Sequence, residues 1–194
     1  MAKLYFRYGA MNCGKSTAII QVAYNYEEKG QKVLLMKPSI DKKGDNRVMN
    51  RSNLSREVDI LLDSNDKVSN YLKDGIAAIL IDEAQFLTEK QVDELYWITK
   101  DKDIPVLCYG LRCDFQMKVF SGSARLLAIA DDLEELKTIC HCGKKATQNL
   151  RLVNGKPTFR GEQVAIDGIG KVTYDSVCGK CYLKYKKGEK VHEG

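Results

Sequence analysis

Apolar runs alternate with amphipathic segments over the first 140 residues. Four short and nearly continuous apolar runs are 3–8 (KLYFRY), 33–37 (VLLMK), 76–82 (IAAILID) and 104–111 (IPVLCYGL). Two segments, 17–28 and 88–100, carry apolar residues at helical spacing, and Thr88 is the predicted N-cap of the second. A third helix is predicted over 121–131 and a last strand over 134–139. Buried strands that alternate with helices predict a parallel sheet with helices on both faces, an α/β fold.

Two segments depart from this alternation. Residues 38–57 are polar and lack apolar periodicity, so they are predicted to form a long loop over a site. From Cys140 onward short β-like pieces, frequent glycines and a Lys-rich tail replace the earlier pattern. The chain is therefore predicted to divide into an α/β domain over 1–138 and a small domain over 139–194.

Composition places the chain among ordinary globular proteins. Of its 194 residues 44% are apolar and 29% charged, which predicts a packed core. The net charge of +5 suits small polyanions such as nucleotides but is too weak and too dispersed to indicate nucleic-acid binding. No apolar run approaches the roughly 18 residues of a membrane span, and the first residues lack an apolar signal core. A cytoplasmic protein with no membrane partner is expected.

A glycine-rich loop follows the first predicted strand. Its eight residues match G-x-x-x-x-G-K-[ST], between a strand and a helix as that motif requires: Gly9, Ala10, Met11, Asn12, Cys13, Gly14, Lys15 and Ser16. In such loops the backbone N–H groups and the following helix N-terminus face phosphates. Lys15 would reach the β- and γ-phosphates, and the Ser16 hydroxyl would bind Mg²⁺. The loop predicts binding of a nucleoside triphosphate and leaves the reaction open.

An acidic pair ends the run 76–82. Asp82 comes at the carboxyl end of a buried strand, where open α/β sheets bind ligands and where an Asp holds the Mg²⁺ shell, directly or through water. Glu83 can orient and deprotonate the group that attacks the γ-phosphate. A helicase needs a second motor domain, and no N-K-x-D segment of a GTPase is present. A small kinase, or a small ATPase with a metal-bearing interaction module, remains.

Four of the seven cysteines form two close pairs. An odd cysteine number in a reducing compartment argues against a disulfide framework. Four thiolates suit a closed, tetrahedral, structural Zn²⁺ site, whose ligands would be Cys140, Cys142, Cys178 and Cys181. Zinc would tie down both ends of the segment 143–177. That segment suits either a lid over a flat nucleobase or a zinc ribbon that contacts a macromolecule.

Together these motifs resemble one family, the thymidine kinases of the cytosolic vertebrate and bacterial type (type II). The resemblance extends over nearly the whole chain, through YGAMNCGKST, YNYEEKG, GDNR, IDEAQFL, IPVLCYGLRCDF, ELKTICHCGKKA, GEQVAIDG and YDSVCGKC. It implies a RecA-like phosphate-loop NTPase sheet with a zinc-ribbon "lasso" domain. It also implies ATP- and Mg²⁺-dependent phosphorylation of the thymidine 5′-hydroxyl in nucleotide salvage, with deoxyuridine as a possible second substrate.

The resemblance also implies roles for individual residues. Glu83 is expected to be the general base, and the loop from Gly9 to Ser16 the ATP phosphate cradle. Further ATP contacts are expected from four residues: Asp45, Arg47, Asp82 and Gln85. Contacts with thymidine are expected from Phe86, Phe115, Gln163, Val164, Ala165, Ile166, Asp167 and Tyr174. Zinc is expected on the four cysteines named above. A homotetramer and feedback inhibition by thymidine triphosphate are expected as well, with no nucleic-acid partner.

The chain departs from the family pattern at a few positions. Its first cysteine pair is C-x-C where some relatives have C-x-x-C, and Asn12-Cys13 is typical of the bacterial branch. Two extra residues precede Tyr174, so the lasso positions from 163 to 174 are assigned to within a residue or two.

Overall fold

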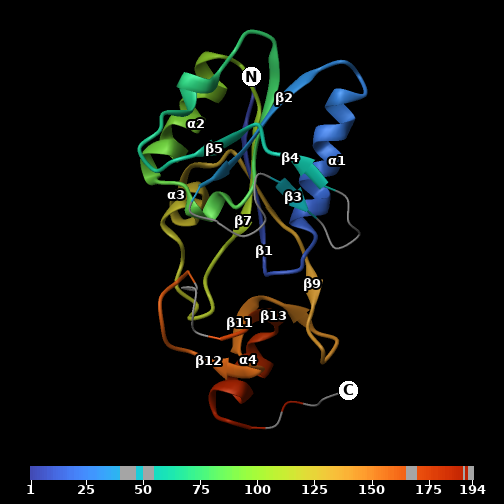
Figure 1. Ribbon diagram of the computed structural model, residues 1–194, viewed down its shortest axis with the longest axis vertical. Coiled ribbons are helices and arrows are strands. Elements are labelled where there is room, and N and C mark those ends of the chain that lie inside the picture. The colour runs from blue at the N-terminus through green and yellow to red at the C-terminus, as the bar shows by residue number, and fades with distance from the viewer. Residues whose placement is uncertain (40–46, 50–54, 165–169, 190, 192–194) are drawn as a thin grey trace.

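The computed structural model describes residues 1–39, 47–49, 55–164, 170–189 and 191. Two parts lie end to end along the long axis of the molecule (Figure 1). The larger part is built around one sheet, and the smaller C-terminal part starts at Thr138. No helix among the described residues is long and apolar enough to cross a membrane.

The central sheet has six parallel strands in the order β5-β2-β6-β7-β1-β8. Their bounds are β1 (Leu4–Gly9), β2 (Lys32–Pro38), β5 (Ile60–Leu62), β6 (Ile76–Ile81), β7 (Val106–Leu111) and β8 (Asp132–Glu135). The four apolar runs form β1, β2, β6 and β7, as the sequence predicts. Because all six strands run the same way, their carboxyl ends meet at one edge, which faces the C-terminal part (Figure 1).

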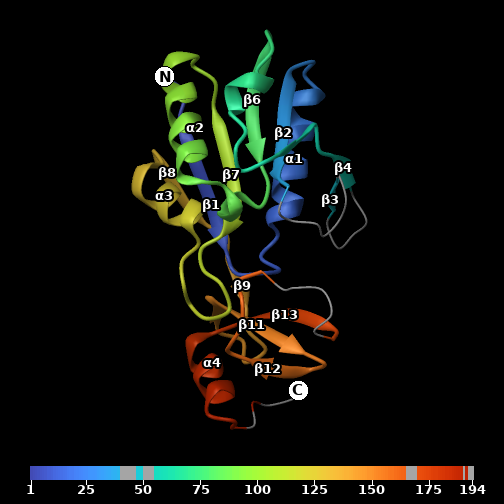
Figure 2. The ribbon, with the colours of Figure 1, turned by 60° about the vertical axis from the view of Figure 1, so that its left-hand side comes forward.

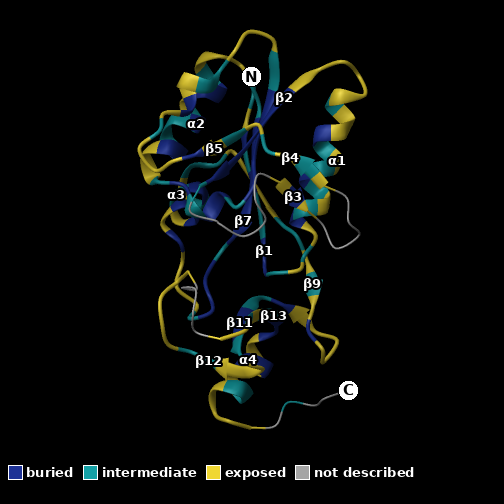
Figure 3. Ribbon diagram, in the orientation of Figure 1, coloured by how far each residue is buried: buried dark blue, intermediate teal, exposed yellow. Residues whose placement is uncertain are grey.

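Helices cover both faces of this sheet (Figure 2). Alternate residues of β2 point to opposite faces, so Leu34 joins one buried cluster and Leu35 the other. Helix α1 (Lys15–Glu27) covers one face, and α2 (Glu89–Asp101) and α3 (Ser121–Ile129) cover the other. The strands between them are the most buried segments of the chain (Figure 3). Burial on both faces explains why the strands read as continuous apolar runs.

Helix α2 begins where the sequence predicts. The Thr88 hydroxyl accepts a hydrogen bond from the Gln91 backbone N–H at 3.3 Å, and the Gln91 side chain accepts one from the Thr88 N–H at 3.1 Å. This reciprocal capping box satisfies two backbone donors that the first turn of a helix leaves unpaired.

Segments between the main strands differ from the predicted pattern. The polar stretch 38–57 contains an antiparallel hairpin, β3 (Arg47–Met49) with β4 (Ser55–Glu57), where the sequence predicts only loop. Short 3₁₀ helices, η1 (Val68–Tyr71) and η2 (Ala84–Phe86), follow β5 and β6. The strand predicted over 134–139 is two strands in different sheets, since β8 pairs with β1 whereas β9 (Thr138–Ile139) pairs with β10 (Lys145–Ala146).

The C-terminal part has its own small core. A three-stranded antiparallel sheet of β12 (Lys156–Thr158), β11 (Gln148–Val153) and β13 (Val172–Val177) packs beside α4 (Gly179–Lys186). Three cysteines belong to this core together with Leu150 and Tyr182.

Hydrogen bonds cross the seam between the two parts. The Tyr182 hydroxyl donates to the Phe115 carbonyl at 2.7 Å. The Asn149 side chain accepts from the Met11 N–H at 2.7 Å and donates to the Cys113 carbonyl at 2.8 Å. Asn149 is buried, so the seam is polar but closed to water at this point.

Candidate active site and metal centre

The glycine-rich loop connects β1 to α1. Gly14 adopts a left-handed conformation (φ 88°) and precedes the first helical residue, Lys15, without a side-chain cap. Gly9 allows close packing, since a Cβ there would lie 2.4 Å from the Cys13 sulfur and 2.5 Å from the Leu136 carbonyl oxygen. The exposed N–H groups at the start of α1 give this edge of the sheet a positive potential that suits anions.

Lys15 is held against the loop itself. Its ammonium group donates to the Ala10 carbonyl at 3.0 Å and lies 3.5 Å from the Cys13 sulfur. The side chain is 9% exposed, so its charge is largely shielded from water. A cation in such surroundings interacts more strongly with a phosphate than it would in bulk water.

A cavity of about 340 Å³ opens beside this loop. Residues from three other segments complete its lining: Met49 of β3, Glu83 after β6, and Leu111 at the end of β7. Most of the predicted phosphate loop also lines it, namely Met11, Asn12, Cys13, Gly14, Lys15, Ser16 and Thr17. The structure therefore brings Glu83 and the glycine-rich loop, 67 or more positions apart in the sequence, to one cavity.

Asp82 is a buried carboxylate at the end of β6. It is 5% exposed, and its backbone N–H donates to the Met36 carbonyl of β2 at 3.0 Å. Burial, reinforced by the neighbouring charge of Glu83, raises the pKa of Asp82 to about 7, although Lys37 and Lys15 act in the opposite direction. A divalent cation beside this carboxylate would offset the cost of its buried charge.

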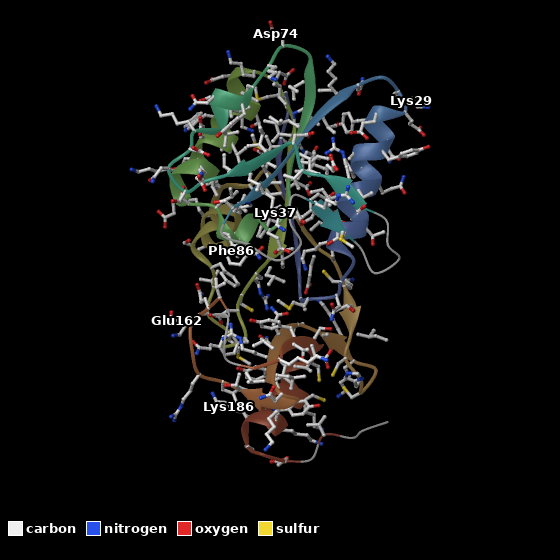
Figure 4. The ribbon with its side chains drawn as sticks, in the orientation of Figure 1. Lys29, Lys37, Asp74, Phe86, Glu162 and Lys186 are labelled. Carbon is white, nitrogen blue, oxygen red and sulfur yellow. The ribbon has the colours of Figure 1, made fainter. Side chains whose placement is uncertain are left out.

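Lys37 is a buried cation near Asp82, and no sequence motif predicts a role for it. It lies at the carboxyl end of β2, is 3% exposed, and its charge favours ionised Asp82. Figure 4 shows it in the interior of the larger part. The signal in the sequence is a lysine within the otherwise apolar run VLLMKP, since lysine is rarely buried without an anionic neighbour.

Glu83 has an unusual backbone conformation. Its φ of 50° and ψ of 38° are left-handed, which costs a residue other than glycine about 1–2 kcal/mol. The carboxylate accepts a hydrogen bond of 2.5 Å from the side-chain amide of Gln85. Gln85 itself is 1% exposed and accepts from the Leu111 N–H at 3.0 Å.

Arg151 contacts several of the residues predicted to bind thymidine, although no sequence motif includes it. Its guanidinium lies 3.6 Å from the ring centre of Phe115 and donates to the Tyr174 hydroxyl at 2.9 Å. It also donates to the carbonyls of Glu162 and Gln163, at 2.8 Å and 2.7 Å. The buried arginine therefore joins Phe115, Gln163 and Tyr174 in one cluster.

Other predicted contacts are placed as follows. Phe86 packs edge-to-face on Phe120, with ring centres 5.5 Å apart, and Figure 4 shows it at the end of the larger part that faces the C-terminal part. Arg47 forms an ion pair with Glu57 across the β3–β4 hairpin at 2.9 Å. Val164 is 39% exposed. Asp45, Ala165, Ile166 and Asp167 lie outside the described residues.

The four paired cysteines come together in the C-terminal part. Their sulfurs all lie within 4.8 Å of one another, contributed by the turn after β9 and by the start of α4. Four sulfurs at 2.3 Å from one tetrahedral ion would be about 3.8 Å apart, so the arrangement fits a metal ion. Cys140, Cys178 and Cys181 are buried, whereas Cys142 is exposed.

The surroundings act in opposite directions on two thiols of the cluster: burial and the neighbouring cysteines raise the pKa of Cys181 to about 12. A backbone hydrogen bond from Lys144, together with the neighbouring thiol of Cys178, lowers the pKa of Cys142 to about 6. The Cys178 sulfur also accepts from the Cys181 N–H at 3.4 Å and caps α4. Thiolates are the form in which cysteines bind metal.

Comparisons with known proteins agree on one family. The family model described as Thymidine kinase matches residues 2–182. A thymidine kinase of Shewanella oneidensis is 46% identical, over 95% of this chain and 98% of the relative. A thymidine kinase of Chromobacterium violaceum is 46% identical, over 94% of this chain and 98% of the relative. One of Idiomarina loihiensis is 47% identical, over 93% of this chain and 95% of the relative.

The raised pKa of Asp82 predicts how stability depends on pH. With a folded-state pKa near 7, the folded metal-free chain keeps a proton that the unfolded chain releases, so stability falls as pH rises from about 4 to about 7. Asp82→Asn removes this cost. Its melting temperature is expected to exceed that of the wild type by roughly 5 °C at pH 8 without metal or nucleotide, and by less as pH falls. Calorimetry at several pH values measures this difference.

Asp74→Asn, which removes one carboxylate at an exposed position, is the matched control. An Asp82→Asn effect of equal size at every pH would contradict the assignment.

Proposed function

Because the chain belongs to the thymidine kinase family, we propose that it transfers the γ-phosphoryl group of ATP to the 5′-hydroxyl of thymidine. The products are thymidine monophosphate and ADP. The observation that supports this most is the shared cavity, in which a carboxylate, Glu83, faces a phosphate-type loop. The alternative of a small ATPase with an interaction module is not favoured, since these relatives, which match over more than nine-tenths of the chain, carry the name thymidine kinase.

We assign the donor half of the site to the glycine-rich loop. Backbone N–H groups of the loop and the Lys15 ammonium bind the phosphates and stabilise charge on the transferring group. The Ser16 hydroxyl and the Asp82 carboxylate are oxygen donors of the kind that Mg²⁺ prefers, directly or through water. When bound with ATP, that ion neutralises phosphate charge. Lys37 and Lys15 keep the Asp82 carboxylate near positive charge before the ligand arrives.

We assign the acceptor half to Glu83 and the cluster around Arg151. The Glu83 carboxylate accepts the proton of the thymidine 5′-hydroxyl. At the same time the 5′-oxygen bonds to the γ-phosphorus, and the bond between that phosphorus and the β–γ bridging oxygen breaks, which releases ADP. Phe115 is buried beneath the Arg151 guanidinium, which also bonds the half-buried Tyr174, and we propose that this cluster supports the base and sugar of thymidine. A base held there excludes water, which would compete with thymidine as acceptor.

We further propose that the four-cysteine cluster binds a structural Zn²⁺. The four sulfurs would fill all four positions of a tetrahedral ion, so none would be open to substrate. The ion would fix the turn after β9 to α4 and so hold both ends of the segment that contains Gln163 and Tyr174.

Several expectations from the family resemblance accompany this proposal. They are a homotetramer, inhibition by thymidine triphosphate, a cytoplasmic location, a division into domains at residues 138 and 139, and ATP contacts by Asp45 and Arg47. The name that the relatives share supports ATP and thymidine as the substrates. Size-exclusion chromatography with light scattering measures the number of subunits directly.

The substrate is tested with labelled ATP and a panel of nucleosides. We expect labelled thymidine monophosphate, a smaller amount of product with deoxyuridine, and none with adenosine or guanosine, because a base site of fixed shape rejects larger purines. Chromatography of the labelled products measures this. ATP hydrolysis without a labelled nucleoside product would contradict the proposed function and favour the ATPase.

Glu83→Gln tests the general base. The amide keeps the shape of the side chain but cannot accept a proton, so kcat should fall on the order of 100-fold or more while the KM values for ATP and thymidine change little. Steady-state kinetics measure both parameters. Glu89→Gln, a neutralised exposed carboxylate in the first turn of α2, is the matched control. Turnover of Glu83→Gln close to the wild-type rate would rule out this role.

Cys178→Ser tests the metal. Serine can still cap α4 but is a poor zinc ligand, so bound zinc should be lost and thymidine affinity should fall by about tenfold, with a smaller change for ATP. Elemental analysis gives the metal content, and calorimetry gives both affinities. Cys108→Ala, which removes a buried cysteine from β7, should leave zinc unchanged. Equal losses of affinity for both ligands would indicate general unfolding instead of a structural zinc in the lid.

A further inference from the structure

Gln85 has a side chain whose two polar atoms both have protein partners. Its Nε2 donates to the Glu83 Oε2 at 2.5 Å, and its Oε1 accepts from the Leu111 N–H at 3.0 Å. A carboxylate can only accept and a backbone N–H can only donate, so these partners allow one orientation of the amide. The Gln85 side chain is 1% exposed, so its amide is shielded from bulk water.

The surroundings of Gln85 leave its amide little freedom. Gly110 of β7 lies against it, and a Cβ at that position would come within 2.8 Å of the Gln85 Oε1. On the other side Gly122 of α3 packs against η2, where an added Cβ would lie 2.6–2.9 Å from the carbonyl oxygens of Leu87, Ala84 and Gln85. Two glycines thus let β7 and α3 close on the turn that carries Glu83.

Glu83 needs such support. Its left-handed backbone is a strained conformation that neighbouring contacts must maintain, and its carboxylate borders the cavity of the glycine-rich loop. The amide of Gln85 connects that carboxylate to the backbone of Leu111, which lines the same cavity at the end of β7.

We propose that Gln85 is a positioning residue for the base: it holds the Glu83 carboxylate toward the acceptor hydroxyl and contributes nothing to ATP binding through its side chain. This inference rests on the proposed function. It differs from the family resemblance, which places Gln85 among the ATP contacts.

A double-mutant cycle separates the two roles. Gln85→Met keeps the length and bulk of the side chain but removes both hydrogen bonds. We expect kcat to fall between about 10-fold and 100-fold, with the KM for ATP changed less than about threefold, because a base displaced by an ångström loses most of its advantage. In a Glu83→Gln background the same change should lower kcat by less than about threefold, because the base it positions is already absent.

Gln91→Met is the matched control for loss of a buried glutamine. Gln91 is 3% exposed and its amide also donates to backbone, at 2.7 Å to the Asp63 carbonyl, but it lies in α2 away from the cavity. Gln91→Met should therefore lower the melting temperature without lowering kcat. Gln85→Asn, which keeps an amide too short to span Glu83 and Leu111, gives a second test if Gln85→Met folds poorly.

Three results would overturn the inference. They are an equal loss of kcat in both backgrounds, a rise in the KM for ATP in place of the loss of kcat, and a crystal structure of Gln85→Met with the Glu83 carboxylate unmoved. The last measurement is independent of turnover. Wild-type thymidine phosphorylation, measured with the nucleoside panel, tests the proposed function separately.

Discussion

Parallel pairing of β6, β7 and β1 is the constraint on which the rest of the site depends. Gly9 pairs with Leu111 at the ends of β1 and β7, and Ile81 pairs with Cys108 one strand further along. This register brings the first residue of the glycine-rich loop, the acidic pair after β6 and the Leu111 N–H to one edge of the sheet. Each strand is buried on both faces, so a slip in register would exchange the side chains that the two cores receive and misplace all three groups together.

Local patterns predict the parts of the molecule that local physics determines. Continuous apolar runs identify the central strands, the Thr88 cap identifies the start of α2, and glycine spacing identifies the loop before α1. The strand predicted over 134–139 is wrong in its extent, because β8 and β9 join different sheets and nothing in the run EELKTI marks the change of partner. The hairpin β3–β4 is missed for a similar reason, since Val48 is the one buried residue of its two short strands and a single apolar position gives no period.

The roles of residues whose partners lie far away in the sequence are harder to predict from the sequence. Arg151 and Lys37 are single basic residues in ordinary strands, and only the tertiary structure shows that one stacks on Phe115 and the other lies near Asp82. Gln85 stands within the recognisable segment IDEAQF, yet its partner Leu111 is 26 positions away. A motif indicates that a residue belongs to a site, whereas its atom-level partners require the fold.

The hydrogen bonds of Asn149 have a consequence for how the C-terminal part can move. With its two hydrogen bonds and that of Tyr182, the C-terminal part is bonded to both the glycine-rich loop and the segment after β7. Rotating that part outward as a rigid body would break all three bonds, at about 1 kcal/mol each or more where a buried group is left unpaired. The three bonds therefore hold the C-terminal part against the glycine-rich loop and against the segment after β7. Movement of the C-terminal part would be transmitted through Asn149 to the Met11 backbone, so the acceptor side and the donor side of the proposed site are mechanically connected.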